Sequence, residues 1–440
     1  MICGKNRIER AAVPNTRSLY NGKGLNVNTI LKIFAKNIDR VYKTCYNEHM
    51  FEKRFDDCLW AAPNFSHIAL YIKRKGECVM DLLICGDLCP TDESKECFEN
   101  EDARGAFGNV IEEFKKSDTV IVNLECAVTE HKQGIRKYGP CLKGPKGTVK
   151  TLKNAGVDTC MLSNNHFFDF GKKGFYDTLK ILDENKMRYT GVGENYEKSR
   201  NDLMLKDGDF SVSVINVCEH EYSYATCNRV GTRPFDEFQT MEDIRKAKAL
   251  SDYVIVIYHG GKEFCRYPSP RLMKACREMA LCGADAVFCQ HSHIIGCYEK
   301  FNNAHILYGQ GNFHFIESTH GESFLEGLMV RLTVDKNKSD IEFIPVAANG
   351  KGIELAGSER KNKILNEFKT RNEYIKSGEW EKHWHDFCME NAERYKSVLC
   401  DHKIDDCMDS FQLFAHYLDC EAHTDVWREI FKTWNHTNEM

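Results

Sequence analysis

The strongest constraint on the fold is a regular alternation of short apolar segments and amphipathic segments between residues 77 and 347. Each apolar segment is long enough for one buried strand, and each amphipathic segment has helical spacing. This alternation predicts an α/β core in which helices cover the sheets. The expected strands are 77–85, 119–122, 158–162, 189–190, 210–217, 253–257, 284–288 and 304–308, with a closing hairpin of 328–334 and 341–347. The expected helices are 108–116, 148–155, 173–185, 241–250 and 271–281.

The sequence pattern changes on both sides of this region. Residues 1–76 hold one helical pattern, 26–45, and one strand pattern, 67–72, so we expect an N-terminal extension there. Beyond the second boundary strand patterns vanish, and residues 356–440 are expected to be an α-helical region. The alternating region, 77–355, is expected to form the main domain.

Composition narrows the class of protein. The chain has 440 residues and a net charge of -5, which argues against a general nucleic-acid binder. No apolar run reaches the roughly 18–20 residues of a transmembrane span, and no apolar segment typical of a signal peptide follows the N-terminus. The 21 cysteines are scattered through expected strands and helices, which favours reduced thiols over a disulfide scaffold. A cytoplasmic protein is therefore expected.

Polar or ionisable residues follow most of the expected strands. The histidines His291 and His293, one residue apart after strand 284–288, are a weak metal signal by themselves. Several strand ends that carry carboxylates, amides or imidazoles are harder to explain by packing, because buried polar groups cost free energy unless they are paired. A shared pair of divalent cations would pair them, and mixed nitrogen and oxygen ligands suit Mn, Fe or Zn. The residues are Asp87, Asn123, Glu125, Asn165, His166, Asp169, His259, Glu263, His291 and His293.

The order of these motifs resembles the CapA-type capsule and poly-γ-glutamate biosynthesis proteins of the calcineurin-like metallophosphoesterase superfamily. The resemblance covers roughly residues 80–348 and implies a four-layer α-β-β-α sandwich with a metal site along one edge of the two sheets. The motifs that carry it are Gly86-Asp87, Asn123-Leu124-Glu125, Asn164-Asn165-His166-x-x-Asp169, His259-x-Gly261-x-Glu263, His291-x-His293 and Gly311-Asn312-Phe313.

The resemblance also implies a role for each site residue. The implied ligands are Asp87 and His293 for a first metal ion, Asn165, His259 and His291 for a second, and Glu125 between them. His166 would be a general acid or would stabilise charge in the transition state, and Asp169 would orient it. Asn123 and Glu263 are expected either to support the ligands, Glu263 by supporting His259, or to be ligands themselves.

The sequence departs from this family pattern in two informative places. Cys89 stands where the superfamily often has the histidine of an Asp-x-His motif, so either Cys89 is a softer ligand or the first metal is held more weakly. His259-Gly260-Gly261 replaces the usual His-Trp-Gly, which removes an aromatic wall beside the site.

Basic residues near the expected site suggest an anionic small molecule or polymer as substrate. Arg136, Lys137, Lys143 and Lys146 lie in the loop between Glu125 and Asn165, and Arg229 and Arg233 lie in another loop. Arg136, Lys143 and Arg233 are the candidate substrate contacts, and a solvated charged loop stays open as the other explanation.

The expected function is a metal-dependent hydrolase acting on a phosphoester or related bond in capsule, poly-γ-glutamate or surface polysaccharide biosynthesis. Two cations would lower the pKa of a bridging water and polarise the electrophile. One alternative is a metal-binding accessory protein of a polymer-synthesis complex, which the loss of the Asp-x-His histidine favours. Another is a two-metal amide or peptide hydrolase. CapA-like proteins are often membrane-anchored, and this chain shows no anchor, so we expect it either to act in the cytosol or to reach the membrane through a partner. The expected partners include polymer-synthesis machinery.

Overall fold

The structure, a computed structural model, describes residues 79–219, 222–400 and 408–436. The predicted helix 26–45 and strand 67–72 lie outside the described residues. Within them, the first sheet is eight-stranded and mixed, and β15 pairs with the carboxyl end of β1 beside the main path. Its strands, in spatial order, are β18 (Gly352–Leu355), β17 (Ser339–Asn349), β16 (Glu326–Val334), β1 (Met80–Cys89), β2 (Thr119–Leu124), β5 (Thr159–Met161) and β6 (Arg188–Thr190), with β15 (Asn312–Phe315).

The second sheet of the described residues is six-stranded, and its four inner strands are parallel. Its order is β13 (Tyr298–Phe301), β14 (Ala304–Leu307), β12 (Ala286–Gln290), β11 (Tyr253–His259), β9 (Phe210–Cys218) and β8 (Leu203–Asp207). Two short pairs stand apart: β3 (Ala127–Val128) with β4 (Lys143–Gly144), and β7 (Val192–Gly193) with β10 (Gly231–Thr232).

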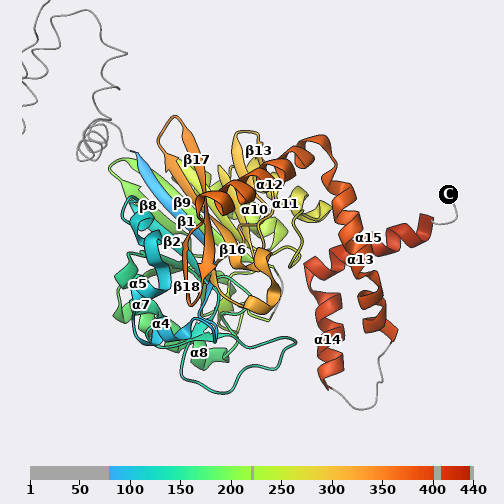
Figure 1. The fold of residues 1–440 in the computed structure, drawn as a ribbon, viewed down its shortest axis with the longest axis horizontal. Helices are drawn as coiled ribbons and strands as arrows, with labels where there is room; N and C mark the ends of the chain where they lie inside the picture. Colours follow the sequence, from blue (N-terminus) through green and yellow to red (C-terminus); the bar gives the residue numbers. More distant parts are fainter. Residues whose placement is uncertain (1–78, 220–221, 401–407, 437–440) are drawn as a thin grey trace, which may run out of the picture. The chain divides into compact units, whose positions relative to one another are not determined.

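The apolar residues divide into three cores that define four layers. Successive side chains of a strand point to opposite faces, and β1 follows this rule. Leu82 and Ile84 belong to the core between the two sheets, whereas Leu83 and Cys85 belong to the core under the helices of the first sheet. The third core lies under the helices of the second sheet. The predicted α-β-β-α sandwich is confirmed, and Figure 1 shows α5 and α7 flanking the first sheet.

Helices cover the outer faces of both sheets. The first sheet is flanked by α4 (Lys95–Glu99), α5 (Ala103–Phe107), α6 (Ile111–Phe114), α7 (Thr148–Ala155) and α8 (Gly171–Glu184), and the second by α10 (Glu237–Leu250) and α11 (Pro270–Leu281). The remaining short helices are α9 (Tyr196–Ser199), η2 (Gly108–Val110), η3 (Ser318–His320) and η4 (Glu322–Leu325).

Four long helices follow the last strand, and they share a core with the second sheet. Strand β18 ends at Leu355, and the helices are α12 (Ser358–Ser377), α13 (Trp380–Cys400), α14 (Met408–Asp419) and α15 (Glu421–His436). Trp384 and Trp427 lie in the same apolar core as Val256 of β11 and Met273 of α11. None of the helices in the described ranges combines the length and the apolar character that crossing a membrane requires.

Most predicted elements are present, and the clearest difference concerns 108–116. There the chain forms the 3₁₀ turn η2 followed by the short helix α6 instead of one helix. Gly108 has φ +47°, and a Cβ there would lie 2.9 Å from the carbonyl oxygen of Ile353. The close approach of β18 therefore separates α5 from η2 at this glycine.

Candidate metal centre

The carboxyl ends of parallel strands from both sheets meet at one edge of the sandwich. Asp87 of β1 is in register with Asn123 of β2, and His259 of β11 is in register with Gln290 at the end of β12. The backbone N–H of His291 donates to Asp87 Oδ2 over 2.9 Å, which joins the two sheets at this point. The strand ends thus bring together side chains that are far apart in the sequence.

Three groups of donor atoms lie close enough together to hold divalent cations. The atoms of each group lie within 4.8 Å of one another. The groups are Asp87 with Glu125 and His293, Glu125 with His259 and His291, and Glu263 with His291 and His293. Glu125 belongs to the first two groups, as a bridging carboxylate would.

Asparagine side chains support these donors. Asn123 Nδ2 donates to Asp87 Oδ1 over 2.7 Å and lies 3.1 Å from His259 Nδ1. Asn165 Oδ1 lies 3.0 Å from His259 Nε2, so an amide oxygen joins the second group. Asn312 Oδ1 lies 2.9 Å from His293 Nδ1. Such partners fix the ring orientations of the histidines.

Burial and charge at this site fit a bound cation. Both carboxylate oxygens of Glu125 are buried without a hydrogen-bond partner among the described residues, and His259 Nε2 lies 3.3 Å from Oε1. Burial, with the charge of Asp87 beside it, raises the pKa of Glu125 well above its ordinary value. Burial lowers the pKa of His293, but Glu125 and Asp87 outweigh it and raise that pKa. The carboxylates therefore lack a compensating charge that a divalent ion would supply.

The backbone at the site adopts conformations that cost free energy. His291 has φ +85°, His293 φ +58° and Phe264 φ +60°. Non-glycine residues with positive φ are uncommon and concentrate at functional sites. The surrounding structure therefore holds the two imidazoles in a turn that the free chain would avoid.

His166 and Asp169 meet as the resemblance implies, and a lysine joins them. His166 Nδ1 lies 2.6 Å from Asp169 Oδ2. Lys137 Nζ lies 2.7 Å from Asp169 Oδ1 and 3.2 Å from His166 Nδ1, and its side chain is buried. Lys137, which the sequence placed in a substrate-receiving loop, is instead paired inside the protein.

The space beside His259 is filled by residues that were not among the site residues predicted from the strand ends. A Cβ at Gly260 would lie 2.5 Å from Cγ of Glu219, so Glu219 occupies the room of the side chain expected from the family pattern. Glu219, His259, His291 and Cys420 line one small pocket together with Asn165. Glu219 directly follows β9, so its position after the expected strand 210–217 was the signal that could have identified it.

Cys89 lies beside the site without joining its donors. It belongs to none of the candidate donor groups in the described part of the chain. A hydrogen bond with Cys126 and burial raise the pKa of Cys89 well above its ordinary value, which keeps the thiol protonated. The option of Cys89 as a softer ligand is therefore not supported.

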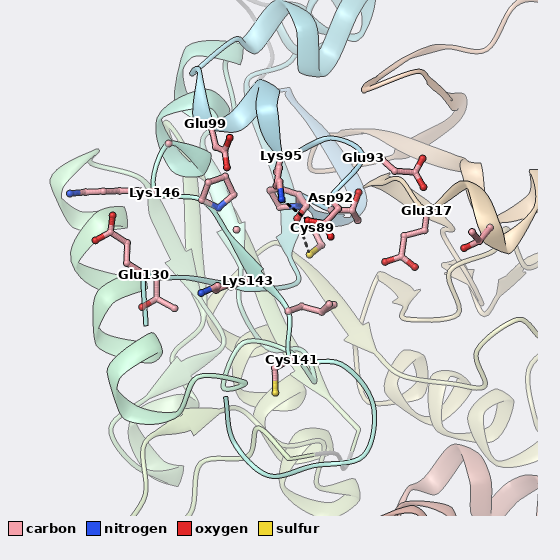
Figure 2. Close-up of a pocket in the computed structure, with 18 residues that line it drawn as sticks. Cys89, Asp92, Glu93, Lys95, Glu99, Glu130, Cys141, Lys143, Lys146 and Glu317 are labelled. Carbon is pink, nitrogen blue, oxygen red and sulfur yellow. Dashed lines mark hydrogen bonds and ion pairs between the residues drawn. The ribbon is translucent and has the colours of Figure 1, made fainter. Parts of the chain in front are cut away.

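A large groove opens next to Cys89. It has a volume of about 870 Å³, and both lysines and carboxylates line it. Figure 2 shows Glu317 on the opposite side of this groove from Glu130 and Lys146. Lys143 also lines it, while Arg136 is exposed and does not.

The substrate role predicted for Arg233 is wrong. Its side chain is buried, and its guanidinium pairs with Asp202 and Asp243, each over 2.7 Å. These two ion pairs join the loop before α10 to α10 and to the residue that precedes β8. An arginine in this position cannot reach an incoming anion.

Residues 81–317 match the model of the family described as bacterial capsule synthesis protein PGA_cap. The chain belongs to this family. The match contains Asp87, Glu125, Asn165, His259 and both residues of the His-x-His pair. It confirms the resemblance on which the site roles rest.

The individual proteins that this chain resembles are each less than 30% identical to it. The capsule biosynthesis protein CapA of Bacillus anthracis is 28% identical over 253 residues, which are 56% of this chain and 62% of that protein. This chain thus spans less than two thirds of that relative. A putative 5'-nucleotidase from Staphylococcus aureus, solved in complex with α-ketoglutarate, has 16% identity and a TM-score of 0.39, over 66% of this chain and 58% of that one. TT1561 of Thermus thermophilus has 9% identity and a TM-score of 0.33, over 60% of this chain and 99% of that one.

Proposed function

We propose that this PGA_cap protein is a hydrolase that uses two divalent transition-metal ions, Mn, Fe or Zn, to cleave a phosphoester or related bond in capsule, poly-γ-glutamate or surface polysaccharide biosynthesis. The observation that carries the proposal is the position of Glu125. Its buried carboxylate belongs to two donor groups at once, and each group adds its own histidine. One carboxylate between two such groups is what a dinuclear centre requires.

The residues divide the work of such a reaction. Asp87, Glu125 and His293 would hold one ion, and Glu125, Asn165, His259 and His291 the other. When bound, a pair of ions lowers the pKa of a water ligand and polarises the electrophile.

His166 is suited to handle the proton of the leaving group. Asp169 accepts the Nδ1 hydrogen of His166, which fixes the imidazole ring, and the proton of the leaving group would be exchanged at Nε2. Lys137 holds the Asp169 carboxylate from its other oxygen and so positions the pair.

The groove beside the site supports an anionic, extended substrate. Lys143 and Lys146 line it, and it opens at Cys89, two residues after the ligand Asp87. Carboxylates in the same groove, including Glu130 and Glu317, would favour a substrate that also carries cationic groups or bound cations.

The test compares wild type with His166→Ala on a panel of generic phosphomonoesters and phosphodiesters after loading with Mn²⁺. Loss of a general acid should lower kcat by about 10²- to 10⁴-fold. His385→Ala, a change of a histidine on α13, is the matched control and should keep the wild-type rate. If the wild-type protein hydrolyses none of the esters faster than His166→Ala does, the proposal is contradicted.

A metal-binding accessory role is the second candidate, and the side chain at position 89 favours it. The thiol of Cys89 leaves the first ion one imidazole short of the superfamily pattern. In that case wild type would bind metal and still show the residual rates of His166→Ala.

A further inference from the structure

The carboxylate of Glu263 lies next to both histidines of the His-x-His pair. Its ligand atom and those of His291 and His293 lie within 4.8 Å of one another. The family resemblance implied that Glu263 supports His259. Among the described residues, however, Glu263 makes no hydrogen bond or ion pair with any side chain, His259 included.

The backbone fixes Glu263 in this position from both sides. The N–H of Gly260 donates to Gln290 O over 3.2 Å, and the N–H of Phe264 donates to Ser292 O over 2.9 Å. These two bonds tie the loop that carries Glu263 to the turn that carries the histidines. Phe264 holds a left-handed conformation, φ +60°, and stacks on Phe324 with ring centroids 6.0 Å apart.

The surroundings of Glu263 also fit a cation. Its side chain is partly buried, and its ligand atom lies beside those of two imidazoles. A partly buried carboxylate that makes no hydrogen bond in the described structure, and that faces two imidazoles, has the composition of a metal site.

The two histidines connect this group to the rest of the centre. His293 also belongs with Asp87 and Glu125, and His291 also belongs with Glu125 and His259. Glu263 thus lies where a third carboxylate could reach an ion at either position. The Cys89 thiol leaves a ligand missing at the first of them.

We propose that Glu263 is a direct metal ligand of this chain, which binds a divalent cation between His291 and His293 and supplies the donor that Cys89 does not. The inference rests on the metal centre of the proposed function. It adds a carboxylate to an oxygen-rich donor set, which suits Mn²⁺.

The experiment measures binding of Mn²⁺ to the metal-free full-length chain by isothermal titration calorimetry and electron paramagnetic resonance. Wild type should bind two ions. In Glu263→Gln, which keeps the shape and removes the charge, at least one ion should bind more than about 100-fold more weakly, beyond the usual effect of a supporting residue. The resonance spectrum of the remaining Mn²⁺ should change as well.

Two further variants complete the design. Glu322→Gln removes an exposed carboxylate in η4 that pairs with Lys363, and it should bind Mn²⁺ like wild type. Glu263→Asp keeps the charge but shortens the side chain by one methylene. Its Kd for Mn²⁺ should therefore lie between those of wild type and Glu263→Gln. If Glu263→Gln does not fold, as judged by circular dichroism in EDTA, Glu263→Asp decides, and a Kd within twofold of wild type overturns the inference.

The outcomes separate this inference from the proposed function. If wild type binds no Mn²⁺, both are overturned. If wild type binds two ions and Glu263→Gln binds two with the same affinity and spectrum, only the role of Glu263 is overturned.

Discussion

At the residue scale, the candidate centre concentrates negative charge that the protein alone does not balance. Glu125 and Asp87 are fully buried, and their proximity raises the pKa of Glu125. Residues of this kind are kept at a cost in stability when function requires them. The centre should therefore respond to metal and to neutralising mutations in opposite ways.

We expect Glu125→Gln to stabilise the metal-free protein and to abolish tight metal binding. The change removes a buried carboxylate whose oxygens accept no hydrogen bond among the described residues, so the metal-free form should gain about 1 kcal/mol or more. Thermal unfolding in EDTA checks the first effect, and calorimetric titration with Mn²⁺ checks the second. A lower Tm than wild type in EDTA would show that the carboxylate is stabilising without metal.

A buried histidine away from the site should make the fold sensitive to acid. His314 packs against Phe98 and Phe107, with ring centroids 4.9 Å and 5.4 Å apart, and burial lowers the pKa of His314 to about 4 from 6.5. As pH falls, this histidine is protonated in the unfolded chain before it is protonated in the folded protein. Its neutral form therefore does not reduce the free energy of unfolding above pH 6.5, and the free energy of unfolding falls between pH 6.5 and pH 4.

His314→Phe should remove this acid sensitivity. Between pH 7 and pH 4.5, wild type should lose about 2–3 kcal/mol of unfolding free energy more than the variant. Urea unfolding at the two pH values gives the difference directly, and other titrating groups cancel because both proteins carry them. Equal losses in the two proteins would show that His314 is not held neutral.

At the element scale, one buried ion network joins a strand end, a helix of the second sheet and the last helix. Arg271 of α11 pairs with Glu219, which follows β9, and with Asp425 of α15 over 2.8 Å. Ser269 Oγ donates to Asp425 Oδ2 over 2.6 Å. Because Glu219 and Cys420 line the same pocket as His259, this network also sets the wall of the candidate site.

Asp425→Ala should loosen α15. It leaves the Ser269 hydroxyl without its acceptor and Arg271 with Glu219 as its remaining ion-pair partner, in a buried place, which should cost about 3 kcal/mol. Hydrogen exchange should accelerate in 421–436 more than in β11. Lys432→Ala, on the exposed side of α15, should leave exchange unchanged. Equal acceleration in the two variants would exclude the network as the cause.

The element pattern could be read from the sequence because apolar periodicity reports directly on strands and helices. The α7 bounds, 148–155, agree with the prediction at both ends, and the hairpin of β16 and β17 pairs antiparallel as expected. The predictions failed where a distant segment determines the local shape. The helix expected at 108–116 instead begins as the 3₁₀ turn η2 at Gly108, the residue that β18, from the end of the domain, approaches.

Some properties of the candidate site could also be predicted from the sequence, and others could not. Strand ends and the family resemblance brought the ligands together, since parallel strands end at one edge. The partners of charged side chains could not be read, because ion pairs depend on three-dimensional neighbours. Arg233 is neutralised by Asp202 and Asp243, and Lys137 by Asp169, and neither pairing leaves a pattern in the sequence.

At the scale of the whole molecule, the family match is shorter than the folding unit. The match ends at residue 317, whereas β1, which carries Asp87, pairs over Met80–Ile84 with β16. Val330 and Leu332 of β16 also belong to the core between the sheets. The strands and helices beyond 317 therefore complete both the first sheet and the core on which the site rests.

A fragment of residues 81–317 should not fold. It would expose the edge of β1 and remove the apolar residues of β16, β17 and the C-terminal helices from all three cores. Urea unfolding followed by circular dichroism should show no cooperative transition for the fragment and a clear one for the full chain. A cooperative transition of the fragment would mean that the matched segment is a domain by itself.

The placement of β1 also sets the order of events during synthesis. The Ile84 carbonyl oxygen accepts a hydrogen bond from Gln310, 226 residues later, and Asp87 is in register with Asn312. At about 5–20 residues per second, a ribosome needs on the order of ten seconds or more to make the chain between them. For most of that interval Asp87 and Glu125 already exist, but His291 and His293, which belong to their donor groups, are made only shortly before Gln310. Metal insertion would then be a late event. The identity of the bound ion would therefore depend on which metal is available when synthesis ends.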